Sequence, residues 1–198
     1  MLSRQARLID HSASAMLRSL AANATGAVPF ASIAEAAGAR VHGLALLLLV
    51  LPETLPLPLP SISVVLALPL LVISVHLTLF GEGSGWPARL ERVAVPRTVL
   101  AAMAEYLAPI LERLEDASRP RWRGLARRER LVGFVAIYLS AILFLPIPFM
   151  NAAPALCLAA IALGLIQRDG LLIAIGFAGT AVISGMLAWL GIWAASIL

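Results

Sequence analysis

Lysine is absent from this 198-residue sequence, and charged residues of both signs together make up only 13% of it. Soluble domains carry about 25% charged residues, so the shortage excludes a disordered chain, a coiled coil and most soluble enzyme folds. Cysteine occurs once, at Cys157, which excludes an intrachain disulfide. The three histidines are scattered along the chain, so the ligand spacing of a metal site is also missing. We expect no metal and no cofactor.

Apolar residues take the place of the missing charges. Hydrophobic residues make up 61% of the chain and the mean hydropathy is +0.93, which predicts that lipid is the main solvent. All the basic residues are arginine, and ten of the 15 lie in residues 89–130, between two apolar regions. Cytoplasmic loops of membrane proteins carry this bias. We therefore expect this connector to face the cytoplasm, and we expect no nucleic-acid partner.

Two segments are predicted to form amphipathic helices. Residues 1–20 lack the apolar core of a signal peptide, and their apolar residues fall near one stripe. This first helix can lie on the membrane or pack on the rest of the protein. Residues 93–114 also have an apolar face, and we expect them on the membrane surface. Residues 119–130 can then meet anionic lipid or form a solvated loop.

Each apolar region begins with a stretch too short to be a membrane span. Residues 43–52 are apolar, but they reach only the middle of a bilayer, since a span needs about 20 residues. Alternating prolines then bar a helix, and residues 61–80 supply a further apolar stretch. Residues 131–144 and the prolines that follow repeat this plan. Residues 171–198 carry no formal charge and are predicted as one full span.

The two apolar regions match each other at an offset of 90 residues. The aligned pairs are Arg40 and Arg130, Gly43 and Gly133, LPLP at 55–58 and LPIP at 145–148, and Ser61 and Asn151. The pattern predicts two repeats, each of which begins with a half-helix. An arginine at the start of the half-helix lies at the membrane edge, and a glycine lies where it contacts another helix. A proline break follows, and the serine or asparagine caps the next helix. The prolines assigned to the breaks are Pro56, Pro58, Pro60, Pro146, Pro148 and Pro154.

Broken helices in internal repeats are typical of transporter binding sites, although a purely architectural re-entrant fold is the alternative. The sequence leaves open whether the two repeats run parallel or inverted. Glu53 lies at the first predicted break, where a carboxyl group is costly unless it is paired, protonated or hydrated. This placement favours a role for Glu53 in proton or cation handling. The alternative is that the break lies near the membrane surface and that Glu53 is simply exposed to solvent there.

Four further residues are candidates for binding. Ser61 and Asn151 stand after the two breaks, and helix capping is the alternative role for Asn151. Arg168 and Asp169 form a charged turn between two apolar stretches. This turn is a candidate for binding or transport; the alternatives are an interfacial loop and an ion pair between an arginine and an acid that bridges to residues 112–130.

The order and spacing of several short motifs resemble a known family. These motifs are LPLP at 55–58, PLL at 69–71, RPR at 119–121, LPIPF at 145–149, Asn151, PA at 154–155, GL at 164–165 and RDG at 168–170. Across residues 33–172 they resemble the ExoD family of bacterial exopolysaccharide-synthesis membrane proteins. The resemblance implies a multi-pass protein of the bacterial inner membrane with a link to surface polysaccharide, and it implies no reaction. The chain departs from the family at Glu53, where a polar amide is usual, and at His76, where glutamine is common. We interpret His76 as a satisfied core or interface histidine, with a proton relay as the alternative.

We therefore predict an all-α integral membrane protein with two repeats of proline-broken, re-entrant-type helices. Its single domain comprises an N-terminal amphipathic region (1–40), repeat 1 (41–81), the Arg-rich connector (82–130), and repeat 2 with the final span (131–198). The leading hypothesis is a small transporter of an ion, a proton or a lipid-linked sugar. No catalytic set is recognisable, so we do not expect an enzyme. The alternative is a non-catalytic scaffold of an exopolysaccharide synthesis complex, and glycines 176, 179 and 185 favour a homodimer.

Overall fold

The computed structural model describes residues 13–54, 60–81, 94–117, 122–126, 128–145 and 151–196. These residues are almost entirely helical, which confirms the all-α prediction. The chain divides into two compact units. Unit 1 comprises Met1–Val41 and Gly83–Arg119, and unit 2 comprises His42–Glu82 and Pro120–Leu198. The arrangement of all residues in one membrane domain stays a prediction.

Unit 1 is built around two helices that are distant in sequence. Its elements are α2 (Ala13–Asn23), β1 (Val28–Pro29), α3 (Phe30–Ala37), η1 (Gly38–Arg40), β2 (Ala94–Val95) and α7 (Arg97–Ala117). The apolar faces of α2 and α7 pack on each other and bury Leu17, Leu100 and Leu111. The short strands pair antiparallel, with Val28 opposite Val95. Helix α2 contains the second part of the helix predicted at residues 1–20, of which 1–12 lie outside the described residues, and α7 corresponds to the helix predicted at 93–114. Each of the two covers the apolar face of the other.

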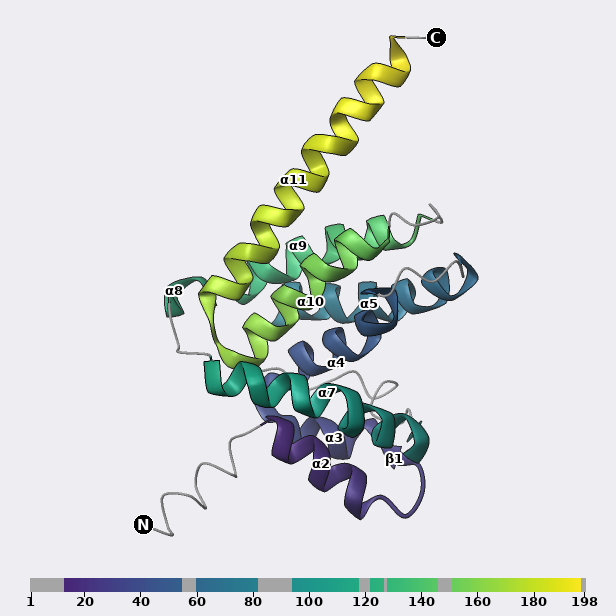
Figure 1. Ribbon diagram of the computed structural model, residues 1–198, viewed down its shortest axis with the longest axis vertical. Coiled ribbons are helices and arrows are strands. Elements are labelled where there is room, and N and C mark those ends of the chain that lie inside the picture. The colour runs from purple at the N-terminus through teal and green to yellow at the C-terminus, as the bar shows by residue number, and fades with distance from the viewer. Residues whose placement is uncertain are drawn as a thin grey trace. The chain divides into compact units, whose positions relative to one another are not determined.

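Unit 2 contains the apolar helices. They are α4 (Val41–Val50, whose first residue belongs to unit 1), η2 (Leu51–Thr54), α5 (Pro60–Phe80), α8 (Arg123–Ala126), α9 (Glu129–Leu143), α10 (Ala152–Gln167) and α11 (Gly170–Ala195). Helix α5 packs along α9, and α10 packs along both α9 and α11 (Figure 1). The core consists of aliphatic side chains from α4, α5, α9, α10 and α11, such as Leu46, Leu70, Leu139 and Leu158.

Two glycines mark close helix crossings between the predicted repeats of unit 2. A Cβ atom on Gly43 of α4 would lie 2.9 Å from the Ala162 carbonyl oxygen of α10. A Cβ atom on Gly133 of α9 would lie 2.7 Å from the Thr78 nitrogen of α5. Only glycine permits such close backbone approach. The first helix of each predicted repeat therefore touches the second helix of the other repeat, at glycines that are 90 positions apart.

Glycines also join α10 to α11, and they correct one sequence-based interpretation. A Cβ atom on Gly176 would lie 2.8 Å from the Cys157 carbonyl oxygen, and one on Gly179 would lie 2.5 Å from the Cys157 Sγ. These two glycines, which the sequence assigned to contact with a second copy, instead pack within the chain. Gly185 has no heavy atom within 4 Å of its Cβ position. Homodimerisation itself stays a prediction.

Among the described helices, α11 is the one that is long and apolar enough to cross a membrane. Its 26 residues extend about 39 Å at 1.5 Å per residue. Three shorter apolar helical stretches accompany it, at Val41–Thr54, Leu66–Phe80 and Ala152–Gln167. The last turns of α11 run past α9 and α10 (Figure 1), and Ile192 in this part of the helix is 72% exposed.

Candidate functional site

Two histidines form a buried pair inside unit 2. His42, the second residue of α4, is fully buried, and His76 of α5 is nearly so. The Nε2 atom of His42 lies 3.0 Å from the Nδ1 atom of His76. The ring planes are within 18° of parallel, with centroids 5.3 Å apart. A histidine nitrogen either donates or accepts, so one proton is shared across this contact and both rings cannot be doubly protonated without losing it.

His76 is buried and hydrogen-bonded, as expected of a satisfied core histidine, and a proton relay stays the alternative prediction. His42 was missed, because nothing in the local pattern links it to a residue 34 positions away. The His76 ring also contacts Phe80, one turn later in α5, at a centroid distance of 4.9 Å. Phe80 is exposed, so the pair lies one aromatic ring away from the surface of the unit.

Small hydroxyl side chains line the contact between α5 and α9. Ser74 donates to the Leu70 carbonyl oxygen and Ser140 donates to the Ala136 carbonyl oxygen, each at 2.7 Å. Their two Oγ atoms are 3.4 Å apart, and both serines are fully buried. Such residues allow helices to approach closely while their hydroxyl groups stay satisfied. The contact between α5 and α9 thus contains two buried polar side chains, and both are uncharged.

Glu53 is a buried carboxylate at the far end of α4. It lies in η2 with 7% exposure, next to Thr54, whose Oγ1 donates to the Leu51 carbonyl oxygen at 2.6 Å. Gly43 touches the C-terminal part of α10, and η2 still contacts α10 about 16 Å further along. Glu53 therefore lies towards the N-terminal half of α10. This burial argues against the alternative in which the Glu53 side chain is exposed to solvent at the surface.

The residues predicted to cap the second helices behave differently from expectation. Helix α5 begins at Pro60, so Ser61 is its second residue and does not occupy the cap position. Proline suits a first helical position because its missing N–H would be unpaired there anyway. Asn151 does hold the cap position of α10, but its side chain makes no capping hydrogen bond.

The predicted break prolines fall into two groups. Pro60 opens α5, and Pro154 is buried in the first turn of α10, so both sit where a proline is compatible with a helix. Pro56, Pro58, Pro146 and Pro148 lie outside the described residues. Of the two repeat arginines, Arg40 is half-buried at the end of η1 and Arg130 is exposed on α9.

Arg168 and Asp169 build the turn between α10 and α11. Arg168 adopts a left-handed conformation with φ of +53° and is exposed. Asp169 is buried, and its Oδ1 accepts a hydrogen bond of 2.9 Å from the Leu171 nitrogen, which caps α11. Gly170 lies against the Trp122 carbonyl oxygen. The structure thus gives Asp169 a capping role.

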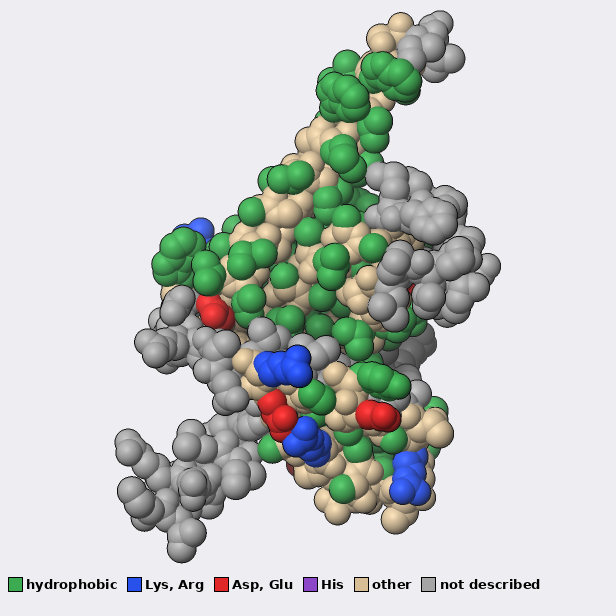
Figure 2. All heavy atoms as spheres, in the orientation of Figure 1, with side chains coloured by type: hydrophobic (Ala, Val, Ile, Leu, Met, Phe, Trp, Pro, Cys, Tyr) green, Lys and Arg blue, Asp and Glu red, His purple; other side chains and the backbone are tan. Residues whose placement is uncertain are grey.

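The described parts of the chain bring together no group of three His, Cys, Asp or Glu side chains that could hold a metal ion. What they do bring together is a set of buried ionisable groups inside an apolar unit. Large hydrophobic side chains also cover its outside: among the residues whose side chains the structure describes, the large exposed hydrophobic ones belong to unit 2, except Tyr106. Figure 2 shows hydrophobic side chains over α10 and α11 on the face in view. Exposed apolar surface of this extent marks a membrane or partner surface.

Helical packing, one helix of membrane-crossing length and an apolar exterior together indicate a membrane-associated helical protein. The family model described as exopolysaccharide synthesis, ExoD, matches residues 13–189, and the chain belongs to this family. The resemblance inferred from the sequence motifs is thereby confirmed, together with a link to exopolysaccharide synthesis. Comparison with curated proteins and with solved structures gave no match.

Proposed function

We propose that this ExoD-family protein is a multi-pass protein of the bacterial inner membrane that mediates the flux of protons or cations. Its location is supported by the apolar exterior of unit 2. Besides Glu53 and the histidines, the described charged side chains of this unit lie at helix ends, at residues 128–130 before and within the start of α9 and at Arg168 and Asp169 between α10 and α11. The start of α9 and the end of α10 lie at the same end of this antiparallel helix pair, so these charges suit one face of a bilayer.

The hydrogen bond between His42 and His76 is the observation that carries the flux proposal. Ionisable residues within membrane helices are costly, and they typically mark proton relays or ion pathways. A pair of imidazoles that shares one proton can pass it on, because each ring can donate from one nitrogen while it accepts at the other. Glu53 adds a buried carboxylate at the opposite end of α4.

The proposed internal repeat is supported by the two glycine crossings. Gly43 packs on α10 and Gly133 packs on α5, so each repeat uses its equivalent glycine against the second helix of the other. Transporters commonly place their ion and substrate groups where two such repeats meet. In this proposal the two short helices, α4 and α9, enter the membrane without crossing it, and α11 crosses it.

Flux can be tested with purified protein in liposomes that contain a pH-sensitive dye. We expect an imposed potential to drive proton entry with the wild-type protein, and His76→Asn and Glu53→Gln to reduce the rate about tenfold or more, since each removes an ionisable group. Glu105→Gln, on the exposed face of α7, is the matched control and should keep the wild-type rate. A rate equal to that of empty liposomes, for protons and for potassium, would contradict the proposal.

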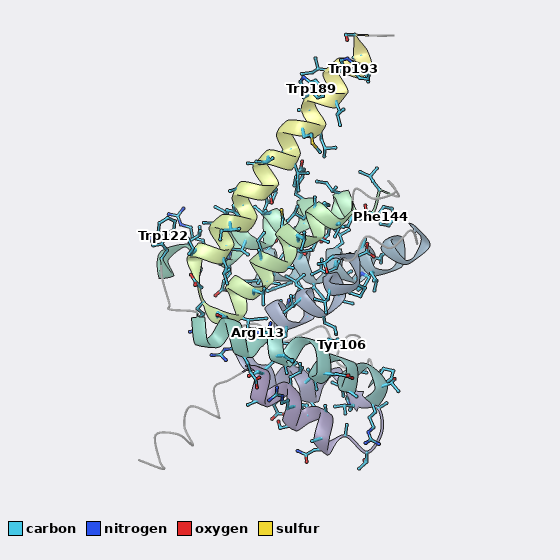
Figure 3. All side chains as sticks on the ribbon, viewed as in Figure 1. Tyr106, Arg113, Trp122, Phe144, Trp189 and Trp193 are labelled. Atoms are coloured by element: carbon cyan, nitrogen blue, oxygen red, sulfur yellow. The ribbon has the colours of Figure 1, made fainter. Side chains whose placement is uncertain are left out.

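A scaffold role is the second candidate, and unit 1 favours it. Tyr106 is 64% exposed on α7, and Arg113, seven residues later on the same helix, is also exposed (Figure 3). Tyrosine and arginine are enriched at the energetic centres of protein interfaces. In this alternative, Tyr106→Ala with Arg113→Ala abolishes co-purification with exopolysaccharide synthesis proteins and lowers polysaccharide output, while liposomes with wild-type protein show no flux.

A further inference from the structure

A pocket lies where α5 ends and α9 begins. Its volume is about 490 Å³, within the range of small-ligand sites. It is lined by Phe80, Gly81, Arg128, Glu129, Arg130 and Leu131. All six residues belong to unit 2, and they meet because Gly133 allows α9 to pack directly on the last turns of α5.

The rim of the pocket carries an excess of positive charge. Arg128 and Arg130 are both exposed, and neither guanidinium forms an ion pair with a described residue. The Glu129 carboxylate lies against the backbone of Gly81, where a Cβ atom would come within 2.7 Å of Oε2. Gly81 has a φ of +76°, a conformation that favours glycine. Glycine therefore suits this position both by its backbone conformation and because a side chain would collide with the Glu129 carboxylate. Two arginines therefore face the pocket with one acidic group between them.

Apolar surface leads away from this rim along α9. Phe80 and Leu131 are exposed within the pocket lining, at 61% and 41%. Phe134 and Tyr138 follow Leu131 at intervals of three and four residues, so they continue the same face of the helix, and both are exposed. The strip runs for about 10 Å from the two arginines. The two arginines at the rim of the pocket are thus followed along α9 by a strip of exposed apolar side chains.

From this arrangement we infer that the pocket binds the phosphate group of a membrane lipid, with the lipid chain lying along Leu131, Phe134 and Tyr138. Guanidinium groups bind phosphate oxygens through paired, charge-assisted hydrogen bonds. The pocket is too small for a whole lipid, which agrees with a site that holds the head group and leaves the chain on the outside. The inference rests on the proposed membrane location but is independent of any flux.

The phosphate can come from two sources that share this chemistry. One is the head group of a bulk phospholipid, and the other is a long-chain isoprenyl phosphate of the kind that carries sugars across membranes. The head-group site is the same in both cases. The difference lies in the chain, because an isoprenyl chain is branched and longer than an acyl chain.

Native mass spectrometry of the full-length protein in a neutral detergent tests the site. Phosphatidylglycerol, an isoprenyl phosphate and diacylglycerol, which lacks phosphate, are titrated separately and then in competition. We expect the wild-type protein to retain the two phosphate lipids in preference to diacylglycerol. Arg128→Gln with Arg130→Gln should weaken that retention about tenfold or more. Arg128→Lys with Arg130→Lys should recover part of it, because lysine keeps the charge without the paired geometry.

The control removes two arginines elsewhere, with Arg18→Gln and Arg97→Gln in unit 1, and should retain phosphate lipid as the wild type does. Preference for the isoprenyl phosphate in competition assigns the site to a lipid-linked carrier, and preference for phosphatidylglycerol assigns it to bulk lipid. Equal retention of phosphate lipid by the Arg128→Gln, Arg130→Gln variant, with a circular dichroism spectrum like that of the wild type, would overturn the inference. Flux in liposomes is measured separately, so failure of one proposal leaves the other standing.

Discussion

His42 and His76 are joined by a 3.0 Å hydrogen bond that ties α4 to α5 across 34 residues of sequence. Both side chains are buried, so the bond is shielded from competing water. It fixes the start of one apolar helix against the last turns of another. This contact is therefore relevant to the stability of unit 2 as well as to the proposed movement of protons.

Removing one partner of this pair should destabilise the protein. In His76→Leu the Nε2 atom of His42 loses its partner while it stays buried, and this costs about 1–3 kcal/mol of unfolding free energy. His42→Leu combined with His76→Leu should cost less than the sum of the two single changes, because no polar group is then left behind. Unfolding in detergent, followed by circular dichroism, measures all three variants. A double variant whose loss equals the sum would show that the two rings are not coupled.

Enlarging the crossing glycines should weaken the packing of unit 2. Gly43→Ala and Gly133→Ala place a methyl group less than 3 Å from a backbone atom of the facing helix, and overpacking of this kind costs about 1–3 kcal/mol. Gly185→Ala is the control, because its Cβ position is open and alanine favours the helix. Thermal unfolding should show lower midpoints for the first two variants and an unchanged or higher midpoint for the third. Unchanged midpoints for Gly43→Ala and Gly133→Ala would mean that the helices separate easily.

The two capping positions should respond differently to alanine. Asp169→Ala removes the side-chain hydrogen bond to the Leu171 nitrogen at the start of α11 and should cost about 0.5–2 kcal/mol. Asn151→Ala removes no capping bond and should stay within about 0.5 kcal/mol of the wild type. Chemical denaturation of both variants in the same detergent provides the comparison. A larger loss for Asn151→Ala would indicate that its amide caps α10 after all.

Glu53 should matter for activity more than for folding. The change Glu53→Gln keeps the size of the side chain but replaces its ionisable carboxyl group with a neutral amide, in which an N–H donor stands where one acceptor oxygen was. We expect any pH dependence of the liposome flux that reflects Glu53 to disappear, while the thermal midpoint changes little. The flux is measured between pH 5 and 8 for the wild type and the variant. Wild-type behaviour of Glu53→Gln across this range would remove Glu53 from the proposed pathway.

Much of the helical structure follows from the local sequence. The apolar stretch at 61–80 corresponds to α5 (Pro60–Phe80), the stretch at 131–144 to α9 (Glu129–Leu143), and the uncharged end to α11 (Gly170–Ala195). The motifs around the prolines were also sufficient to identify the family, since this identification depends only on their order along the chain. Hydropathy and proline position act over a few residues, and these signals can be read without knowing the fold.

The candidate site was less predictable, because its contacts are long-range. His42 and His76 each look like an isolated histidine in an apolar run, and only the packing of α4 beside α5 brings them together. The same holds for Gly176 and Gly179, whose spacing suits contact with any helix. Their partner is α10 of the same chain, which the sequence does not identify.

The contact between Cys157 and Gly179 gives the wild-type chain a built-in reporter of the packing between α10 and α11. Since no other thiol is present, a maleimide can attach at one site alone. Cys157 is half-buried and its sulfur lies against Gly179. The labelling rate would therefore measure how well α11 shields this thiol, without any engineered residue.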